Sequence, residues 1–208
     1  MKMVGSQHRE TSRQRRQRET RQALLAAAYQ SFCELGYAEC SLERIASRAG
    51  FTKGALYGHF SSKEDLFLAL ADARTASLLD TWAQTAEQNA SREVLLHSFG
   101  QWLAATVRER QEWSLVNTEF TVLAARKPAL AARRRAALHE ACADIAAALD
   151  RLAGPEREPG ESAALSRLVL ALIHGLALHA AIDPELDVAA NFALGLDLLA
   201  AARNGHEG

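Results

Sequence analysis

Apolar residues recur at helical spacing along most of the chain, and no alternating run is long enough to predict a β-strand. The segment 21–36 shows the pattern clearly: Leu24, Ala28 and Phe32 share one face, and Gly36 ends the segment. The composition is 49% apolar, rich in Ala and Leu, with only four prolines in 208 residues, which favours helices. The sequence therefore predicts an all-α protein with a well-buried core in one or two domains.

Helix start signals follow in close succession after Gly36. Ser41 precedes one short helical segment, and the stretch FTKGALYGHF (51–60) reads as another short helix capped by Thr52. A longer segment, SSKEDLFLALADARTASLLDTWAQTAEQ, then starts at a cap formed by Ser61 and Ser62, and its first turn is acidic, as the helix dipole prefers. These signals predict two short helices and one long helix in tight sequence.

The composition shifts near residue 90, and the second part is again helical. A break at Lys127-Pro128 precedes a long helix that we expect to end near residue 152. The segment 153–162 holds two prolines, two glycines and charges, which indicates an exposed loop. Two apolar helices are expected over about 162–182 and 185–203.

Positive charge gathers at the start of the chain, although the whole chain has a formal charge of −1. Residues 1–22 hold seven Lys and Arg against two Glu, a net charge of +5, so the remainder carries −6. A basic arm on an acidic protein suggests a polyanionic partner. A solvated, disordered tail is the alternative reading of the arm taken alone.

Residues 42–59 fit a helix-turn-helix. Ala46 stands where two helices touch and only a small side chain fits, and Gly50 follows in the turn, where positive φ is needed. The inward positions of this motif are Ile45, Ala49, Phe51, Leu56 and His59. A small helical hairpin with no role in DNA binding is the alternative.

From about Arg18 to Leu70 the chain resembles the DNA-binding domain of the tetracycline-repressor (TetR) family of bacterial regulators. The matching motifs are F-x-x-x-G-Y at the end of the first helix, S-L-E-R-I-A-S-R-A-G, K-G-A-L-Y-G-H-F and S-K-E-D-L. The rest of the chain fits the family in outline only. The resemblance implies a flexible basic arm over 1–17, a three-helix helix-turn-helix domain over 18–66, and a larger helical ligand-binding and dimerisation domain over 67–208.

The resemblance also implies which side chains meet DNA. These residues are Arg44, Thr52, Lys53, Gly54, Tyr57, His59 and Lys63. A recognition helix enters the major groove by its N-terminal end, which places Thr52 to Gly54 nearest the bases. Tyr57, His59 and Lys63 would face phosphates, and Arg44 or Arg48 would assist base reading. A core position is the alternative for Tyr57 and His59, and a solvated surface position is the alternative for Lys63.

The middle helices present candidate ligand-binding side chains. These candidates are Phe99, Trp102, Trp113, Asn117, Phe120, His139 and His174. Asn117 shares a helical face with two aromatic neighbours, as an apolar pocket with one orienting amide requires. Ordinary core packing is the alternative for each, and Glu119 could pair with a cationic ligand or be a solvated neighbour. The basic cluster Arg126, Lys127, Arg133, Arg134 and Arg135 reads as a solvated helix face or as a second anion patch.

The resulting hypothesis is a homodimeric transcriptional regulator, by family default a repressor that a small-molecule ligand releases from a palindromic operator on double-stranded DNA. The apolar helices at about 162–182 and 185–203 would form the dimer interface. A non-specific or architectural DNA-binding protein is the alternative. Absent nucleotide-binding, nucleophile-elbow and metalloprotease motifs disfavour an enzyme, and we expect no cofactor.

The remaining residue patterns favour a cytoplasmic protein associated with the nucleoid. Three cysteines without a C-x-x-C pair predict reduced thiols. The same spacing, and the five-residue separation of His174 and His179, disfavour a metal site. The most apolar run, 168–182, is too short to span a bilayer and holds two histidines, so no membrane segment is expected.

Overall fold

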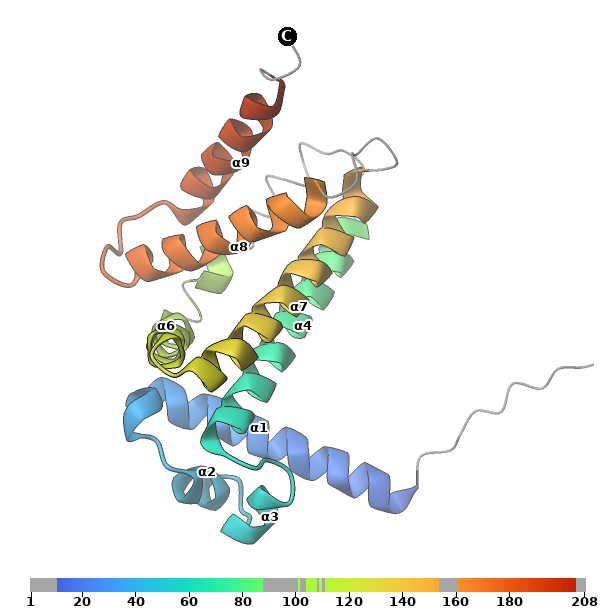
Figure 1. Cartoon of the computed structure of the whole chain (residues 1–208), viewed down its shortest axis with the longest axis vertical. Helices are drawn as coiled ribbons and strands as arrows, with labels where there is room; N and C mark the ends of the chain where they lie inside the picture. The colour runs from blue at the N-terminus through green and yellow to red at the C-terminus, as the bar shows by residue number, and fades with distance from the viewer. Residues whose placement is uncertain are drawn as a thin grey trace, which may run out of the picture. The chain divides into compact units, whose positions relative to one another are not determined.

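The all-α prediction is confirmed by the computed structural model, in which no strand occurs among the residues that it describes (Figure 1). Those residues are 11–87, 101, 104–107, 109, 111–153 and 161–204. The helices are α1 (Ser12–Glu39), α2 (Leu42–Arg48), α3 (Lys53–Tyr57), α4 (Lys63–Glu87), α6 (Gln111–Ala125), α7 (Pro128–Ala153), α8 (Glu161–Ala180) and α9 (Val188–Asn204).

The chain divides into two compact units, Met1–Leu70 and Ala71–Gly208. The division falls inside α4, so that helix begins in the first unit and continues into the second. The sequence-based expectation had placed the division a few residues earlier, between 66 and 67. α1, α2, α3 and the start of α4 make up the described part of the first unit.

Helix α1 begins at Ser12, whereas the sequence-based expectation was a flexible arm over residues 1–17. The Thr11 side chain accepts from the Gln14 backbone N–H at 3.3 Å, and the Gln14 side chain accepts from the Thr11 N–H at 2.9 Å, forming a capping box. The expectation of a flexible arm through residue 17 is therefore corrected, because residues 12–17 are helical. The expected end at Gly36 is marked by a kink, where φ is 75° and ψ is 169°.

Three aromatic rings form the centre of the first unit. Phe32 stacks on Tyr37 with centroids 5.6 Å apart, and Phe67 meets both rings edge-on at 5.4 and 5.3 Å. Burial, and secondly the charge of Glu64, raise the pKa of the Tyr37 hydroxyl. This cluster joins α1 to α4 within the unit, and its Phe32 and Phe67 rings are fully buried.

The predicted N-caps of α2, α3 and α4 are confirmed. The side-chain oxygens of Ser41, Thr52 and Ser62 accept from the backbone N–H three residues on, at 3.2, 3.2 and 3.0 Å. Asp65 reciprocates at α4 by accepting from the backbone N–H of Ser61 at 3.1 Å. These caps fix the start of each short helix, and α3 is only five residues long.

In the second unit α8 packs against α6, α7 and α9. Its apolar contacts include a cluster in which Val188 and Phe192 of α9 are fully buried. Gly195 of α9 lies so close to α8 that a Cβ there would stand 2.7 Å from Leu172 Cδ2. The side chain of Gln111 at the start of α6 donates to the Ala180 carbonyl at the end of α8, at 2.9 Å.

Among the residues that the structure describes, one apolar helical stretch, Ser162–Ala180, is long enough to cross a membrane by length and composition. It contains most of the run 168–182 that the sequence had suggested was too short, so that length argument is corrected. Only 17% of its most apolar window is buried. Most of this window is therefore not covered by the rest of the protein.

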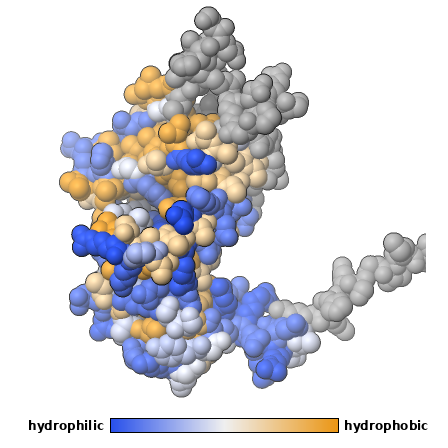
Figure 2. Space-filling model, viewed as in Figure 1, coloured by the Kyte–Doolittle hydropathy of each residue, from blue (hydrophilic) through white to orange (hydrophobic). Residues whose placement is uncertain are grey.

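Exposed large apolar side chains gather on the last two helices of the second unit. Leu168 of α8 is 49% exposed, Leu194 and Leu198 of α9 are 57% and 61% exposed, and Ile182 just after α8 is 81% exposed. Figure 2 shows apolar surface on the part of this unit that holds α8 and α9. A surface of this kind is unusual for a monomer in water.

The three cysteines have free thiols, and Cys40 alone of them is fully buried. Within the described part of the chain, no group of three or more His, Cys, Asp and Glu side chains could hold a metal ion.

Candidate nucleic-acid interface

The turn between α2 and α3 sets the geometry of the candidate interface. Ala46 is 1% exposed, and its carbonyl accepts from the Phe51 N–H at 2.9 Å across the turn. Gly50 between them has φ +76°, a conformation that side chains other than glycine and asparagine rarely adopt. The two small residues thus have the roles that the motif predicts. Of the expected inward positions, Ile45 and Leu56 are buried, whereas Ala49, Phe51 and His59 are only partly buried.

The structure brings most of the predicted DNA-contacting residues to one solvent-facing part of the first unit. Arg44 on α2 is exposed, as are Thr52, Lys53 and Gly54 at the start of α3. Tyr57 at the end of α3 is 47% exposed, so its ring lies outside the core. The exposed N-terminus of α3 presents backbone N–H groups and the ammonium group of Lys53. Both favour contact with negatively charged groups.

Lys53 is already paired on this surface. Its ammonium group forms an ion pair with Glu43 of α2 and lies 5.8 Å from the centroid of the Tyr57 ring. The hydrogen bond to Glu43 raises the pKa of Lys53, and the same contact lowers the pKa of Glu43. The carboxylate therefore neutralises the one cation of α3 in the free protein.

A groove lies beside His59, where the first turns of α1 approach the end of α3. Its volume is about 450 Å³, and its lining residues are Ser12, Arg13, Arg16, Gln17, Thr20 and His59. All six side chains can donate hydrogen bonds, and two are permanently charged. The two arginines belong to the basic segment noted in the sequence, whereas the groove was not predicted. The signal was present in the helical spacing of residues 13, 16, 17 and 20.

Lys63 is partly buried at the start of α4. Its Nζ donates to the Ala38 carbonyl at 3.0 Å and lies 4.5 Å from the centroid of the Tyr37 ring. Burial lowers the pKa of this ammonium group. Lys63 is thus held against the end of α1, with one of its donors used inside the protein.

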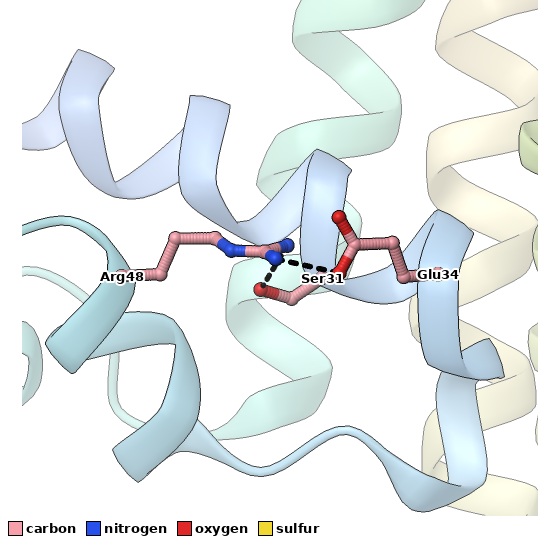
Figure 3. A network of polar contacts seen from close by, with 3 residues as sticks. All are labelled: Ser31, Glu34 and Arg48. Atoms are coloured by element: carbon pink, nitrogen blue, oxygen red, sulfur yellow. Dashed lines mark hydrogen bonds and ion pairs between the residues drawn. The ribbon is translucent and has the colours of Figure 1, made fainter.

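Arg48 ties α2 to α1, as Figure 3 shows. Its Nη1 donates to the Ser31 hydroxyl at 3.3 Å, and its Nη2 donates to the Glu34 carboxylate at 2.5 Å. Ser31 is fully buried, so this contact satisfies a polar group in the core. Both arginines considered for base reading are exposed, but the guanidinium group of Arg48 is engaged by Ser31 and Glu34 within the unit. Phe60, predicted to pack inward, is 4% exposed, and the Arg21 guanidinium lies 5.2 Å from its ring centroid.

The predicted ligand-binding residues have different surroundings in the second unit. Phe99 and Trp102 lie outside the described residues. Phe120 is fully buried, Trp113 and Asn117 are partly buried, and His139 and His174 are exposed.

Arg134 departs from the expectation of a solvated basic face. It is 7% exposed, because it follows buried Leu130 by one helical turn on the inward side of α7. Its Nη2 donates to Asn117 Oδ1 at 2.9 Å. The other members of the cluster, Arg126, Lys127, Arg133 and Arg135, are exposed as expected. The missed signal was the spacing of Leu130, Arg134 and Leu138, which lie four residues apart and so on one face of the helix.

Two family models match this chain. Residues 24–70 match the model described as bacterial regulatory proteins, tetR family. Residues 91–203, more than half of the chain, match the model described as BetI-type transcriptional repressor, C-terminal. The two matches fall on either side of the division between the units.

Individual relatives point the same way. The HTH-type transcriptional repressor AcnR of Corynebacterium diphtheriae is 32% identical over 132 residues, which are 64% of this chain and 63% of that protein. The chain spans 49% of the AcnR proteins of two other Corynebacterium species. A transcriptional regulator from Rhodococcus sp. Rha1 has a TM-score of 0.64 at 26% identity, over 86% of this chain and 94% of that one.

A further structural neighbour contains a ligand. The transcriptional regulator FadR from Bacillus subtilis in complex with stearoyl-CoA has a TM-score of 0.61 at 17% identity, over 86% of this chain and 96% of that one. At this identity the likeness shows the fold alone.

Proposed function

Because this chain belongs to the TetR family of bacterial transcriptional regulators, we propose that it is a homodimeric repressor that a small molecule releases from a palindromic DNA operator. The observation that carries the proposal is the exposed start of α3, held by the turn at Gly50 and flanked by basic helix α1. The matching families and relatives are regulators of transcription, which does not require catalysis by the protein.

The proposed DNA contacts divide into two sets. Thr52, Lys53 and Gly54 would approach base edges in the major groove, with Arg44 beside them. Phosphates would be held by the second set, namely Arg13, Arg16, Tyr57, His59 and Lys63, the last together with the N-terminal amides of α4. The second set is larger than the first, so we expect affinity to depend strongly on salt.

Dimerisation is proposed through α8 and α9, because their exposed apolar side chains would be covered by the same surface of a second copy. Sedimentation of a Leu194→Glu variant tests this, with Val122→Glu as control, since Val122 is 50% exposed on α6. The wild type and the control should sediment as dimers at micromolar concentration, and Leu194→Glu should shift toward monomer. A monomeric wild type would refute the proposal.

A small-molecule effector is proposed for the second unit, among α6, α7 and α8, with Trp113, Asn117, Phe120 and His174 as candidate contacts. Stearoyl-CoA in the FadR complex shows that a protein of this fold can hold such a ligand. Helix α4 runs through the division between the units. A ligand that favours one position of α4 would therefore change the population of DNA-binding conformations.

The decisive test is selection of bound sequences from random DNA by the purified full-length protein. We expect a palindrome with half-sites about one helical turn apart, roughly 34–36 Å. Binding to it should survive a large excess of random competitor, as repression in the cytoplasm on chromosomal DNA requires. If competitor abolishes binding and no sequence is enriched, the alternative of a non-specific DNA-binding protein is supported instead.

A further inference from the structure

A buried cation lies in the second unit, and within the described part of the chain no ion pair is recorded for it. The Arg134 side chain on α7 is 7% exposed, and its Nε has no hydrogen-bond partner among the described residues. Its one described hydrogen bond goes to a neutral group, Asn117 Oδ1 of α6, at 2.9 Å. A buried guanidinium N–H that makes no hydrogen bond costs free energy, so such a group calls for a functional explanation.

The charges around Arg134 do not replace a bound anion. Burial is the main influence on Arg134 and lowers its pKa, while Asp72 of α4 opposes this through its negative charge. Asp72 is exposed to solvent, which weakens its effect on a buried group. On the α8 side the neighbour is His174, which brings no negative charge. Arg134 therefore carries a buried positive charge that these described neighbours offset only weakly.

The surroundings of His174 indicate that solvent reaches this place. Burial lowers the pKa of its imidazole, and the positive charge of Arg134 lowers it further, so the ring is kept neutral. Yet the residue retains an exposed surface. The neutral ring can accept or donate a hydrogen bond there without adding to the positive charge.

We propose that Arg134, with Asn117 and His174 beside it, binds the acidic group of an anionic effector, a small carboxylic acid. This inference rests on the proposed function, since it names the chemical class of the effector. The planar guanidinium can offer Nε–H and a second N–H side by side, the geometry that a carboxylate accepts in two parallel hydrogen bonds. The carboxylate would supply both the missing charge and the missing acceptor for Nε.

A cationic effector is disfavoured by the same arrangement. The Glu119 carboxylate, a candidate partner for a cation in the sequence analysis, belongs to an exposed residue of α6. Arg134, in contrast, is buried, where charge interacts more strongly. A cation close to Arg134 would be repelled by it, whereas an anion would be attracted.

The test measures ligand binding directly, without DNA. The probes are octanoate and benzoate, each compared with its uncharged amide at equal ionic strength, and octylammonium as the cation. Thermal unfolding of the full-length protein is followed by tryptophan fluorescence, because all three tryptophans, Trp82, Trp102 and Trp113, belong to the second unit. We expect at least one acid to raise the unfolding midpoint more than its amide does, and octylammonium to have no effect.

Two variants assign the effect to Arg134. Arg134→Met keeps the length of the side chain but removes the charge, and should bind the acid on the order of 10-fold or more weakly. Without ligand its unfolding midpoint should equal or exceed that of the wild type, because a buried charge without a partner is removed. Arg135→Met, at the exposed neighbouring position of the same helix, should bind the acid as the wild type does.

Several results would overturn the inference. Equal effects of acids and amides on the wild type, or stabilisation by octylammonium, would exclude recognition of an anion whether or not any variant folds. Retention of acid binding by Arg134→Met would exclude this residue. None of these results depends on DNA binding, so the inference can fail while the operator selection succeeds, and the reverse.

Discussion

Substitution by alanine should have opposite effects on stability at Gly50 and at Gly54, although the two glycines are only four residues apart. It should lower the free energy of unfolding at Gly50 and raise it at Gly54. Gly50 has φ +76°, and a Cβ added there would meet no atom within 4 Å. The cost of Gly50→Ala is therefore conformational alone, about 1–2 kcal/mol for a non-glycine residue in the left-handed region. The positive φ of Gly50 forms the turn that positions α3. If the φ angle of residue 50 changed to avoid this cost, α3 would be displaced.

Gly54 lies inside α3, where a Cβ would stand 3.8 Å from Thr52 Oγ1, an ordinary contact. Alanine stabilises a helix interior by roughly 0.5–1 kcal/mol relative to glycine. In a helix of five residues the lower end of that range applies. Gly54→Ala should therefore stabilise the first unit slightly, and the two variants should differ by about 2 kcal/mol.

Unfolding of the two units can be followed separately, because they contain different aromatic residues. All three tyrosines, Tyr29, Tyr37 and Tyr57, belong to the first unit, whereas every tryptophan belongs to the second. Urea unfolding followed by tyrosine difference absorbance thus reports the unit that contains both glycines. Gly50→Asn is the matched control, and it should lose less stability than Gly50→Ala because asparagine tolerates positive φ. The reasoning is wrong if Gly50→Ala is as stable as the wild type, or if both alanine variants are destabilised alike.

Three further predictions concern the first unit. Glu43→Gln should free Lys53, tighten operator binding and steepen the plot of log affinity against log salt by about 0.9; an unchanged slope in a salt titration would contradict this. Arg48→Ala should lower the free energy of unfolding by about 1–2 kcal/mol, because buried Ser31 loses its partner. Urea unfolding measures that loss, and Arg44→Ala, exposed on the same helix, should lose little. The raised pKa of Tyr37 means that the folded state keeps a proton that the unfolded state releases, so stability should fall above about pH 10. Tyr37→Phe should flatten that fall in alkaline denaturation, and an identical pH profile would contradict the assignment.

Local sequence signals were sufficient for the first unit because its helices start and stop at residues with short-range roles. Ser41, Thr52 and Ser62 accept from backbone groups three residues away, and Gly36 and Gly50 supply the two positive φ angles of the described chain. Such contacts depend on neighbours in the chain, so the motif and its resemblance could be recognised without coordinates. The start of α1 was missed only because the Thr11–Gln14 capping box was overlooked.

Contacts between helices determine which charged side chains of the candidate sites are paired and which are buried. Lys53 and Glu43 meet across a turn, Lys63 turns back to the end of α1, and neither pairing follows from residue type or helical spacing. Arg134 shows the difference most clearly. As one of a run of basic residues it resembles a solvated face, but the rotation of α7 places it inside the domain against Asn117. The sequence by itself determined the helices, the helix-turn-helix and the family, because these depend on local hydrogen bonds and apolar periodicity. Only the tertiary structure decided which charges are paired, exposed or buried, because burial and electrostatic interaction depend on distances between residues remote in the chain.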